Sequence, residues 1–162
     1  MATLPTSRIS HPSPFELRLT DNPKAVWFPG QWETIEFVLS STKPFIILGA
    51  PPGTGKTWIA IAVARLLQLR TIYLTSTKQL QDQYVDAGVT KVVGRGNFTC
   101  LIDPSLTAER GICTLSKCDY AGKHGAPGCT YFDQRRFAEE ADDVAMNYAY
   151  ARDDARTGSR AF

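Results

Sequence analysis

The fold is decided by the stretch "ILGAPPGTGKTWIA", residues 47–60, in which a glycine-rich turn separates two apolar runs and ends in Lys-Thr. Gly53 and Gly55 free the backbone to curl, so that its N–H groups point at one anion. A helix that begins near Lys56 adds the positive end of its dipole at the same place. The pattern therefore predicts a phosphate-binding loop, or P-loop, between a buried strand and a helix.

The residues of this loop have separate expected roles in binding ATP and Mg²⁺. Lys56 is expected to reach the β- and γ-phosphates, and the Thr57 hydroxyl is expected to bind the metal. Ala50 stands where the general pattern has glycine, a variant that is often seen in helicases. The predicted nucleotide site comprises Ala50, Gly53, Thr54, Gly55, Lys56 and Thr57.

Helices and strands are expected to alternate around the loop. A first helix is predicted over Pro29–Leu39, and it is followed by a fully apolar strand over Phe45–Leu48. A nearly all-apolar helix, a β-branched strand and a polar-faced helix then follow over Lys56–Leu69, Thr71–Ser76 and Lys78–Val85. This order predicts an α/β fold with a RecA-like parallel sheet and flanking helices.

Polar residues on both sides of the loop are further candidates for binding. The Gln31 amide both donates and accepts, which suits the edge of adenine, although a polar residue at a helix start needs no ligand. Thr75, Thr77 and Lys78 follow a predicted strand and suit the phosphates of a nucleic acid. An ordinary strand-to-helix cap explains these three residues equally well.

Composition limits the classes of protein. Hydrophobic residues make up 43% of the chain, which argues against disorder, and the net charge of +2 is too small to argue for nucleic acid by itself. No apolar run is long enough for a membrane span, and no secretory signal is visible at the N-terminus. We therefore expect a cytoplasmic protein, from a bacterial or phage-infected cell, whose cysteines are metal ligands or free thiols.

Four cysteines lie in a glycine-rich segment with few apolar residues. Cys100, Cys113, Cys118 and Cys129 are separated by 12, 4 and 10 residues, which is not the common zinc-finger spacing. Four thiolates also meet the ligand count of a [4Fe–4S] cluster. From spacing alone, zinc, an iron–sulfur cluster and plain thiols all remain open.

Motifs around these cysteines carry a resemblance to a known family. "GRGNFTC" (94–100) precedes the other three cysteines, and "CTYFDQRRFAEEADDVAMNYAY" (129–150) begins at the last one. Together with Gln31 and the P-loop, they resemble the iron–sulfur DNA helicases of superfamily 2, of the XPD/DinG type, from about Trp27 to Tyr150. The resemblance implies a [4Fe–4S] cluster on the four cysteines, with Zn²⁺ as the alternative, and adenine recognition by Gln31.

The same resemblance implies single-stranded or forked DNA as the partner. Basic residues that suit a phosphate track surround the cysteines, and Arg95 is the candidate that we single out for DNA contact. The others are Lys91, Arg110, Lys117, Lys123, Arg135 and Arg136.

The resemblance divides the chain into five parts. An irregular lead-in (1–26) precedes an ATP-binding motor subdomain (27–91) and a cysteine-rich iron–sulfur insertion (92–130). A helix that returns to the motor domain (131–150) and a tail (151–162) complete the chain.

Hydrolysis of ATP needs an acidic strand that this sequence does not contain. The family has Asp-Glu-Ala-His for this purpose, whereas Asp142-Asp143 and Asp153-Asp154 are interpreted as surface acids. We expect a truncated N-terminal portion of an ATP-dependent DNA helicase, not competent for hydrolysis alone and open to completion by the missing C-terminal part. The alternative is a non-catalytic nucleotide- or DNA-binding module with a structural metal.

Overall fold

The structure, a computed structural model, describes residues 11–111, 118–121 and 126–156. The chain forms two compact units, which are described separately. The first comprises Met1–Leu69 with Asp86–Gly88, and the second comprises Arg70–Val85 with Val89–Phe162. Within the described residues, no helix is long and apolar enough to cross a membrane.

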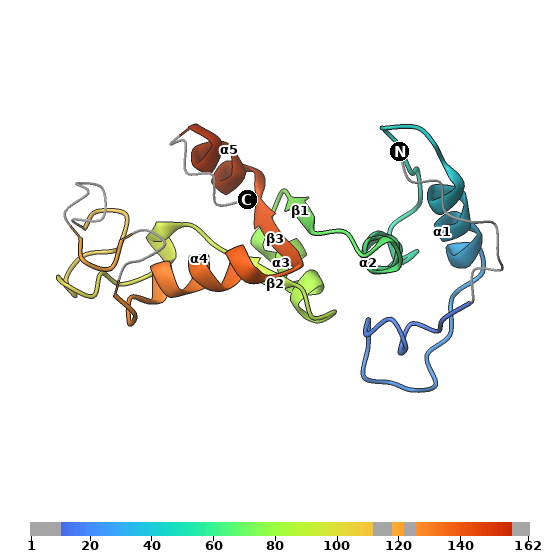
Figure 1. The fold of residues 1–162 in the computed structure, drawn as a ribbon, viewed down its shortest axis with the longest axis horizontal. Helices are drawn as coiled ribbons and strands as arrows, with labels where there is room; N and C mark the ends of the chain where they lie inside the picture. The colour runs from blue at the N-terminus through green and yellow to red at the C-terminus, as the bar shows by residue number, and fades with distance from the viewer. Residues whose placement is uncertain (1–10, 112–117, 122–125, 157–162) are drawn as a thin grey trace. The chain divides into compact units, whose positions relative to one another are not determined.

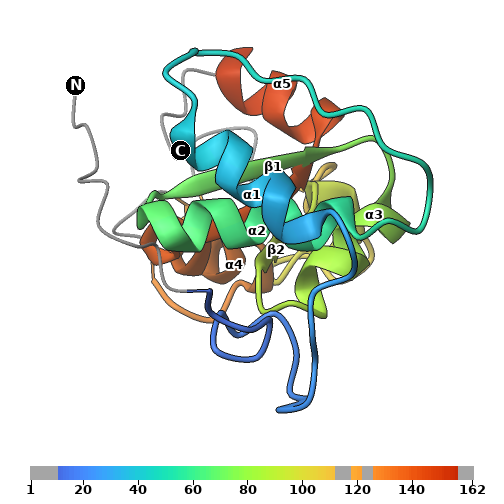
Figure 2. The same ribbon diagram turned by 90° about the vertical axis from the view of Figure 1, so that its right-hand side faces the viewer.

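The first unit is built on two helices that pack against each other, α1 (Gln31–Ser40) and α2 (Lys56–Leu67) (Figure 2). α1 begins two residues later than predicted, after Gly30, whose left-handed φ of 84° lies outside the helical region. The buried apolar side chains of the pair are Trp32, Ile35, Ile59, Ile61, Ala62 and Ala64.

An arginine of α2 holds two distant pieces of chain against this unit. The Arg65 guanidinium donates hydrogen bonds to the carbonyls of Leu17 and Arg18, and it also donates to the carbonyl of Ala87. Residues 11–26 are irregular, as predicted, although Leu19 is buried. Arg65 therefore explains why residues 86–88 belong to the first unit.

The predicted strand over Phe45–Leu48 is wrong. The structure describes this segment as coil, with Phe45 88% exposed and Ile47 96% exposed. Apolar side chains favour a buried strand only where neighbouring strands satisfy its backbone groups. Among the described residues, the strands of the molecule pair with one another and leave this segment out.

The second unit contains a parallel sheet of three strands in the order β1-β3-β2 (Figure 1). The strands are β1 (Thr71–Thr75), β2 (Thr90–Val92) and β3 (Asp143–Asn147). β1 lies where a strand was predicted, and β3 is buried along Val144–Met146 as the central strand. Asp143 was interpreted as a surface acid, but it is half-buried in β3 and accepts a hydrogen bond from the Tyr73 hydroxyl at 3.1 Å.

Helices cover both faces of this sheet. α3 (Lys78–Val85) has the predicted bounds, and its Tyr84 ring lies 4.7 Å from the ring of Tyr73. Gln81 of α3 is fully buried and donates to carbonyls of β2 and β3. On the other face, α4 (Thr130–Glu140) joins a core that contains Val92, Val144, Met146, Tyr131, Phe132 and Ala138.

The carboxyl ends of β2 and β3 lead into two short elements. η1 (Arg95–Asn97) is a single turn of 3₁₀ helix after β2, and α5 (Tyr148–Arg156) directly follows β3. The Asn147 side chain accepts a hydrogen bond from the N–H of Tyr150 at 2.7 Å, which caps the start of α5. The first part of the predicted tail (151–162) is therefore helical, as far as Arg156.

Candidate nucleotide-binding site

The predicted phosphate loop is a curled turn that leads directly into α2. Gly53 and Gly55 have φ values of 81° and 75°, a region that side-chain-bearing residues rarely adopt. Gly55 is the N-cap of α2, so the first N–H groups of the helix have no partner within the helix. The loop thus offers unpaired backbone donors at the positive end of a helix dipole.

The Lys56 side chain forms hydrogen bonds to the backbone at the start of the loop. Its Nζ donates to the carbonyl of Ala50 at 2.8 Å and to the carbonyl of Pro51 at 2.7 Å. The Thr54 hydroxyl also donates to the Pro51 carbonyl, at 2.8 Å. These bonds engage the ammonium group within the loop, so the expected contact of Lys56 with phosphates would require them to break. Lys56 remains exposed, and Thr57 is half-buried beside it.

Gln31 is buried against the loop, and protein groups occupy both ends of its amide. Its Oε1 accepts the N–H of Phe28 at 2.9 Å, and its Nε2 donates to the carbonyl of Thr54 at 2.9 Å. Only 3% of Gln31 is exposed. The expected contact with adenine would therefore require an existing hydrogen bond to break.

The predicted DNA contacts are mostly engaged within the protein. Thr75 is buried, and its hydroxyl donates to the carbonyls of Thr77 and Met146. The Thr77 hydroxyl accepts the N–H of Leu80, as expected of a cap at the start of α3. The Lys78 ammonium donates to the Asn97 side chain. This geometry favours the capping interpretation for the threonines.

Cysteines 100, 118 and 129 are buried as free thiols, whereas Cys113 lies outside the described residues. Gly111 makes room for Cys100, since a Cβ built on it would lie 2.7 Å from the Cys100 sulfur. Among the described residues, no three His, Cys, Asp or Glu side chains gather as metal ligands. The described cysteines therefore do not by themselves fit a cluster or a zinc ion.

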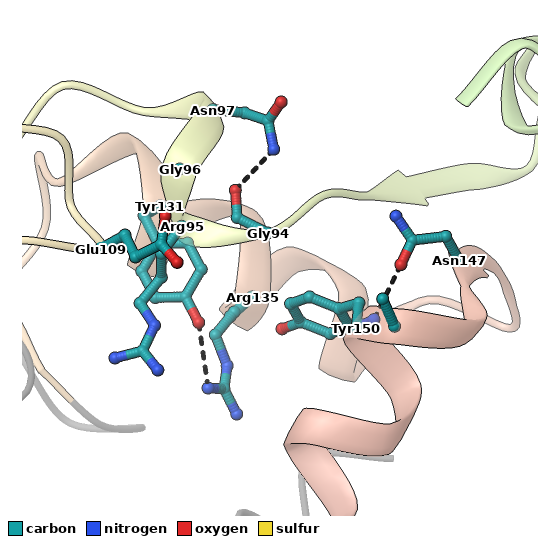
Figure 3. A pocket seen from close by; sticks show the side chains of 10 residues that line it. Gly94, Arg95, Gly96, Asn97, Glu109, Tyr131, Arg135, Asn147 and Tyr150 are labelled. Carbon is teal, nitrogen blue, oxygen red and sulfur yellow. Dashed lines mark hydrogen bonds between the residues drawn. The ribbon is translucent and has the colours of Figure 1, made fainter. Parts of the chain in front are cut away.

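A pocket of about 290 Å³ opens in the second unit, at the carboxyl ends of β2 and β3 (Figure 3). The guanidinium groups of Arg95 and Arg135 lie on the same side of this pocket in Figure 3, and the Tyr131 hydroxyl bonds to Arg135. No carboxylate pairs with Arg95 within the described ranges, although Glu109 also lines the pocket. The full lining is Gly94, Arg95, Gly96, Asn97, Glu109, Tyr131, Arg135, Asn147, Ala149 and Tyr150.

Sequence reasoning named only part of this pocket. Arg95 was a candidate for DNA contact, and Arg135 was one of the basic residues near the cysteines. Glu109, Asn147 and Tyr150 were missed as lining residues, although Asn147 and Tyr150 belong to a quoted motif. Other members of the basic group are used elsewhere: Lys91 pairs with Asp82, and Arg136 with Asp133. Lys117 and Lys123 lie outside the described residues.

Comparison with known proteins gives one family match. Residues 46–98, less than half of the chain, are similar to the family described as ATPase family associated with various cellular activities (AAA). No curated protein and no solved structure matches the chain. The match spans the loop and the following elements as far as η1, and it does not extend to the motifs after Cys100. With the small α/β fold, it supports a P-loop ATPase that binds nucleotide.

Proposed function

We propose that residues 50–57 bind Mg–ATP, and that the chain is the N-terminal ATP-binding portion of an ATP-dependent DNA helicase. The observation that carries the nucleotide site is the closed loop, in which Lys56 gathers two carbonyls and the glycines adopt positive φ. In the bound state, Lys56 and the first N–H groups of α2 hold the β- and γ-phosphates, while the Thr57 hydroxyl takes the metal.

We propose binding without turnover for this chain alone. Cleavage of the γ-phosphate needs a carboxylate that holds Mg²⁺ and a group that orients water. The sequence contains no Asp-Glu-Ala-His, and the Asp143 carboxylate accepts a hydrogen bond from Tyr73 at the start of β3. The missing C-terminal helicase part is the proposed source of these groups.

Replacing Lys56 tests the nucleotide site. Lys56→Ala removes the cation that neutralises the phosphates, so Mg–ATP affinity should fall by at least about 100-fold in calorimetry, since hydrogen bonds to charged groups and direct ion pairing are lost together. Lys43→Ala is the matched control, because Lys43 is an exposed lysine of the same unit outside the loop. Unchanged affinity in Lys56→Ala would contradict the assignment.

The proposed partner is single-stranded or forked DNA, and the pocket of Figure 3 supports it. The pocket lining contains two arginines, Arg95 and Arg135, and one carboxylate, Glu109, a composition that favours a phosphate. Ligand sites of open parallel sheets also lie at the carboxyl ends of the strands, where this pocket lies.

The proposed metal centre rests on the sequence resemblance. We propose that Cys100, Cys113, Cys118 and Cys129 hold a [4Fe–4S] cluster, with Zn²⁺ as the alternative. Burial of the three described thiols in the reduced state is compatible with either metal. The cluster would supply a structural link for a segment with few apolar residues.

A further inference from the structure

Gln31 forms a direct hydrogen bond to the phosphate loop. Its Nε2 bonds to the carbonyl of Thr54, inside the loop, and its Oε1 bonds to the N–H of Phe28, just before α1. One side chain therefore links the start of α1 to the middle of the loop. Since the amide is buried, these hydrogen bonds form in a low-dielectric environment, where they are stronger than at the surface.

The same contact restricts position 55 to glycine. A Cβ placed on Gly55 would lie 2.2 Å from the Gln31 Nε2, closer than two non-bonded atoms can approach. Gly53 has a similar φ, but nothing lies within 4 Å of its Cβ position. The space at Gly55 is thus occupied by the Gln31 amide, whereas the space at Gly53 is open.

The bond also fixes the peptide group that carries one of the phosphate donors. The Thr54 carbonyl and the Gly55 N–H belong to the same planar peptide unit, so holding one holds the other. With the carbonyl bonded to Gln31, the N–H points in the opposite direction, away from the amide. Lys56 orients the carbonyls of Ala50 and Pro51 in the same way.

We propose that Gln31 is a positioning residue of the phosphate loop and does not read the nucleobase. This inference rests on the proposed nucleotide site and specifies which part of the nucleotide Gln31 serves. Gln31 presets the Thr54–Gly55 peptide for the phosphates, so its contribution is the same for every ligand that carries a triphosphate. The ligand class that it serves is the triphosphate chain with Mg²⁺, whatever the base.

The test compares Mg–ATP, Mg–GTP and magnesium tripolyphosphate on wild type and on Gln31→Ala by calorimetry. All three affinities should fall by the same factor, about fivefold to tenfold for one hydrogen bond that holds a binding-competent conformation. A fall for ATP with unchanged GTP and tripolyphosphate would show base reading and overturn the proposal. Unchanged affinity for all three ligands would also overturn it.

Two further variants and a local measurement separate positioning from general damage. Gln31→Met keeps the length of the side chain and adds no charge but loses the donor to Thr54, so it should reproduce the uniform loss even if Gln31→Ala does not fold. Glu33→Ala is the control, an exposed change on the same helix. In hydrogen exchange, the Gln31 variants should accelerate exchange in residues 50–55 and leave the later turns of α2 unchanged. Acceleration throughout the first unit would instead indicate a purely structural role and overturn the proposal.

Failure of the proposed nucleotide site gives a different result from failure of this inference. If wild type binds none of the three ligands, the nucleotide site itself is wrong. If wild type binds them and the ratio of ATP to GTP affinity changes in Gln31→Met, only the positioning role is wrong.

Discussion

At the scale of single residues, three glycines around the phosphate loop perform different tasks. Gly49 has an ordinary φ and open space around its Cβ position, and Gly53 has a positive φ with open space. Gly55 has both a positive φ and the Gln31 amide at its Cβ position. Substitutions at these three glycines can therefore distinguish the effect of backbone strain from the effect of a steric clash.

Alanine at each of these glycines should give a graded series of Mg–ATP affinities. Gly49→Ala should be neutral, and Gly53→Ala should cost about 1–2 kcal/mol in the loop conformation, or roughly fivefold to thirtyfold in affinity. Gly55→Ala should weaken binding more than Gly53→Ala, because it also displaces Gln31. Calorimetry on the three variants provides the measurement.

A double-mutant cycle tests the cause of the extra loss at Gly55. In a Gln31→Ala background, Gly55→Ala should cost no more than Gly53→Ala, since the displaced amide is no longer present. Equal costs of Gly55→Ala in both backgrounds would show that Gln31 and Gly55 do not interact.

The sequence was sufficient to predict the loop but not the contact that braces it. Gly53, Gly55 and Lys56 lie in one short motif that can be recognised from adjacent residues alone. The bond between Gln31 and Thr54 joins residues 23 positions apart, and its existence depends on how α1 packs against α2. From the sequence, adenine and the backbone of the loop are equally suitable partners for the Gln31 amide, because both offer hydrogen-bond donors and acceptors.

At the scale of elements, the basic pocket forms where η1, α4 and α5 meet the carboxyl ends of two strands. Each element contributes a different group: η1 brings Arg95 and α4 brings Arg135, whereas Asn147 is the last residue of β3 and Tyr150 belongs to α5. The Asn147 cap of α5 shapes one wall, because it fixes the direction in which the chain leaves β3.

Arg95→Ala should weaken binding of a single-stranded oligonucleotide. We expect a loss of about fivefold in fluorescence anisotropy and a decrease of about 0.7 in the slope of log affinity against log salt, the values expected for one phosphate contact on a single strand. Glu109→Gln should strengthen binding, because it removes the one carboxylate from the pocket lining. Lys24→Ala is the control, because Lys24 is an exposed lysine of the first unit and does not belong to the basic residues near the cysteines. A loss in the control that equals the loss in Arg95→Ala would show non-specific attraction.

The elements themselves were predictable to different degrees. β1 and α3 carry clear patterns and lie within one residue of their expected bounds. β2 has three residues, too few for alternation to be recognised, and it is a strand because β3 provides its partner. Phe45–Leu48 shows the opposite case, a strongly apolar segment that forms no strand in the described sheet.

At the scale of the whole molecule, the nucleotide site and the proposed metal centre differ in the evidence that supports them. The loop is supported by its geometry and by a family match that ends at residue 98. The first cysteine of the proposed metal centre stands two residues later, and the proposal is supported by the order of the cysteine-flanking motifs. No pattern of hydrophobicity could place these cysteines, since their burial depends on contacts made by residues far apart in the chain.

Protein purified without oxygen from iron-replete cells should be brown and contain about four iron atoms and four sulfides per chain, the stoichiometry of one [4Fe–4S] cluster. Cys129→Ser should lose most of this iron, because a thiolate ligand is removed. Wild type grown with excess zinc provides the comparison. A colourless protein with stoichiometric zinc would contradict the cluster and show that zinc is the metal.

The division of the chain into two units affects how the polypeptide can be cleaved into fragments. The polypeptide passes between the two units at Leu69–Arg70, at Val85–Asp86 and again at Gly88–Val89. No single cleavage can separate them intact, because a fragment that ends at Leu69 leaves Arg65 without the carbonyl of Ala87. Cleavage on either side of residues 86–88 should instead leave the two fragments associated. A split-protein design would need to include this tripeptide in the fragment that carries the first unit.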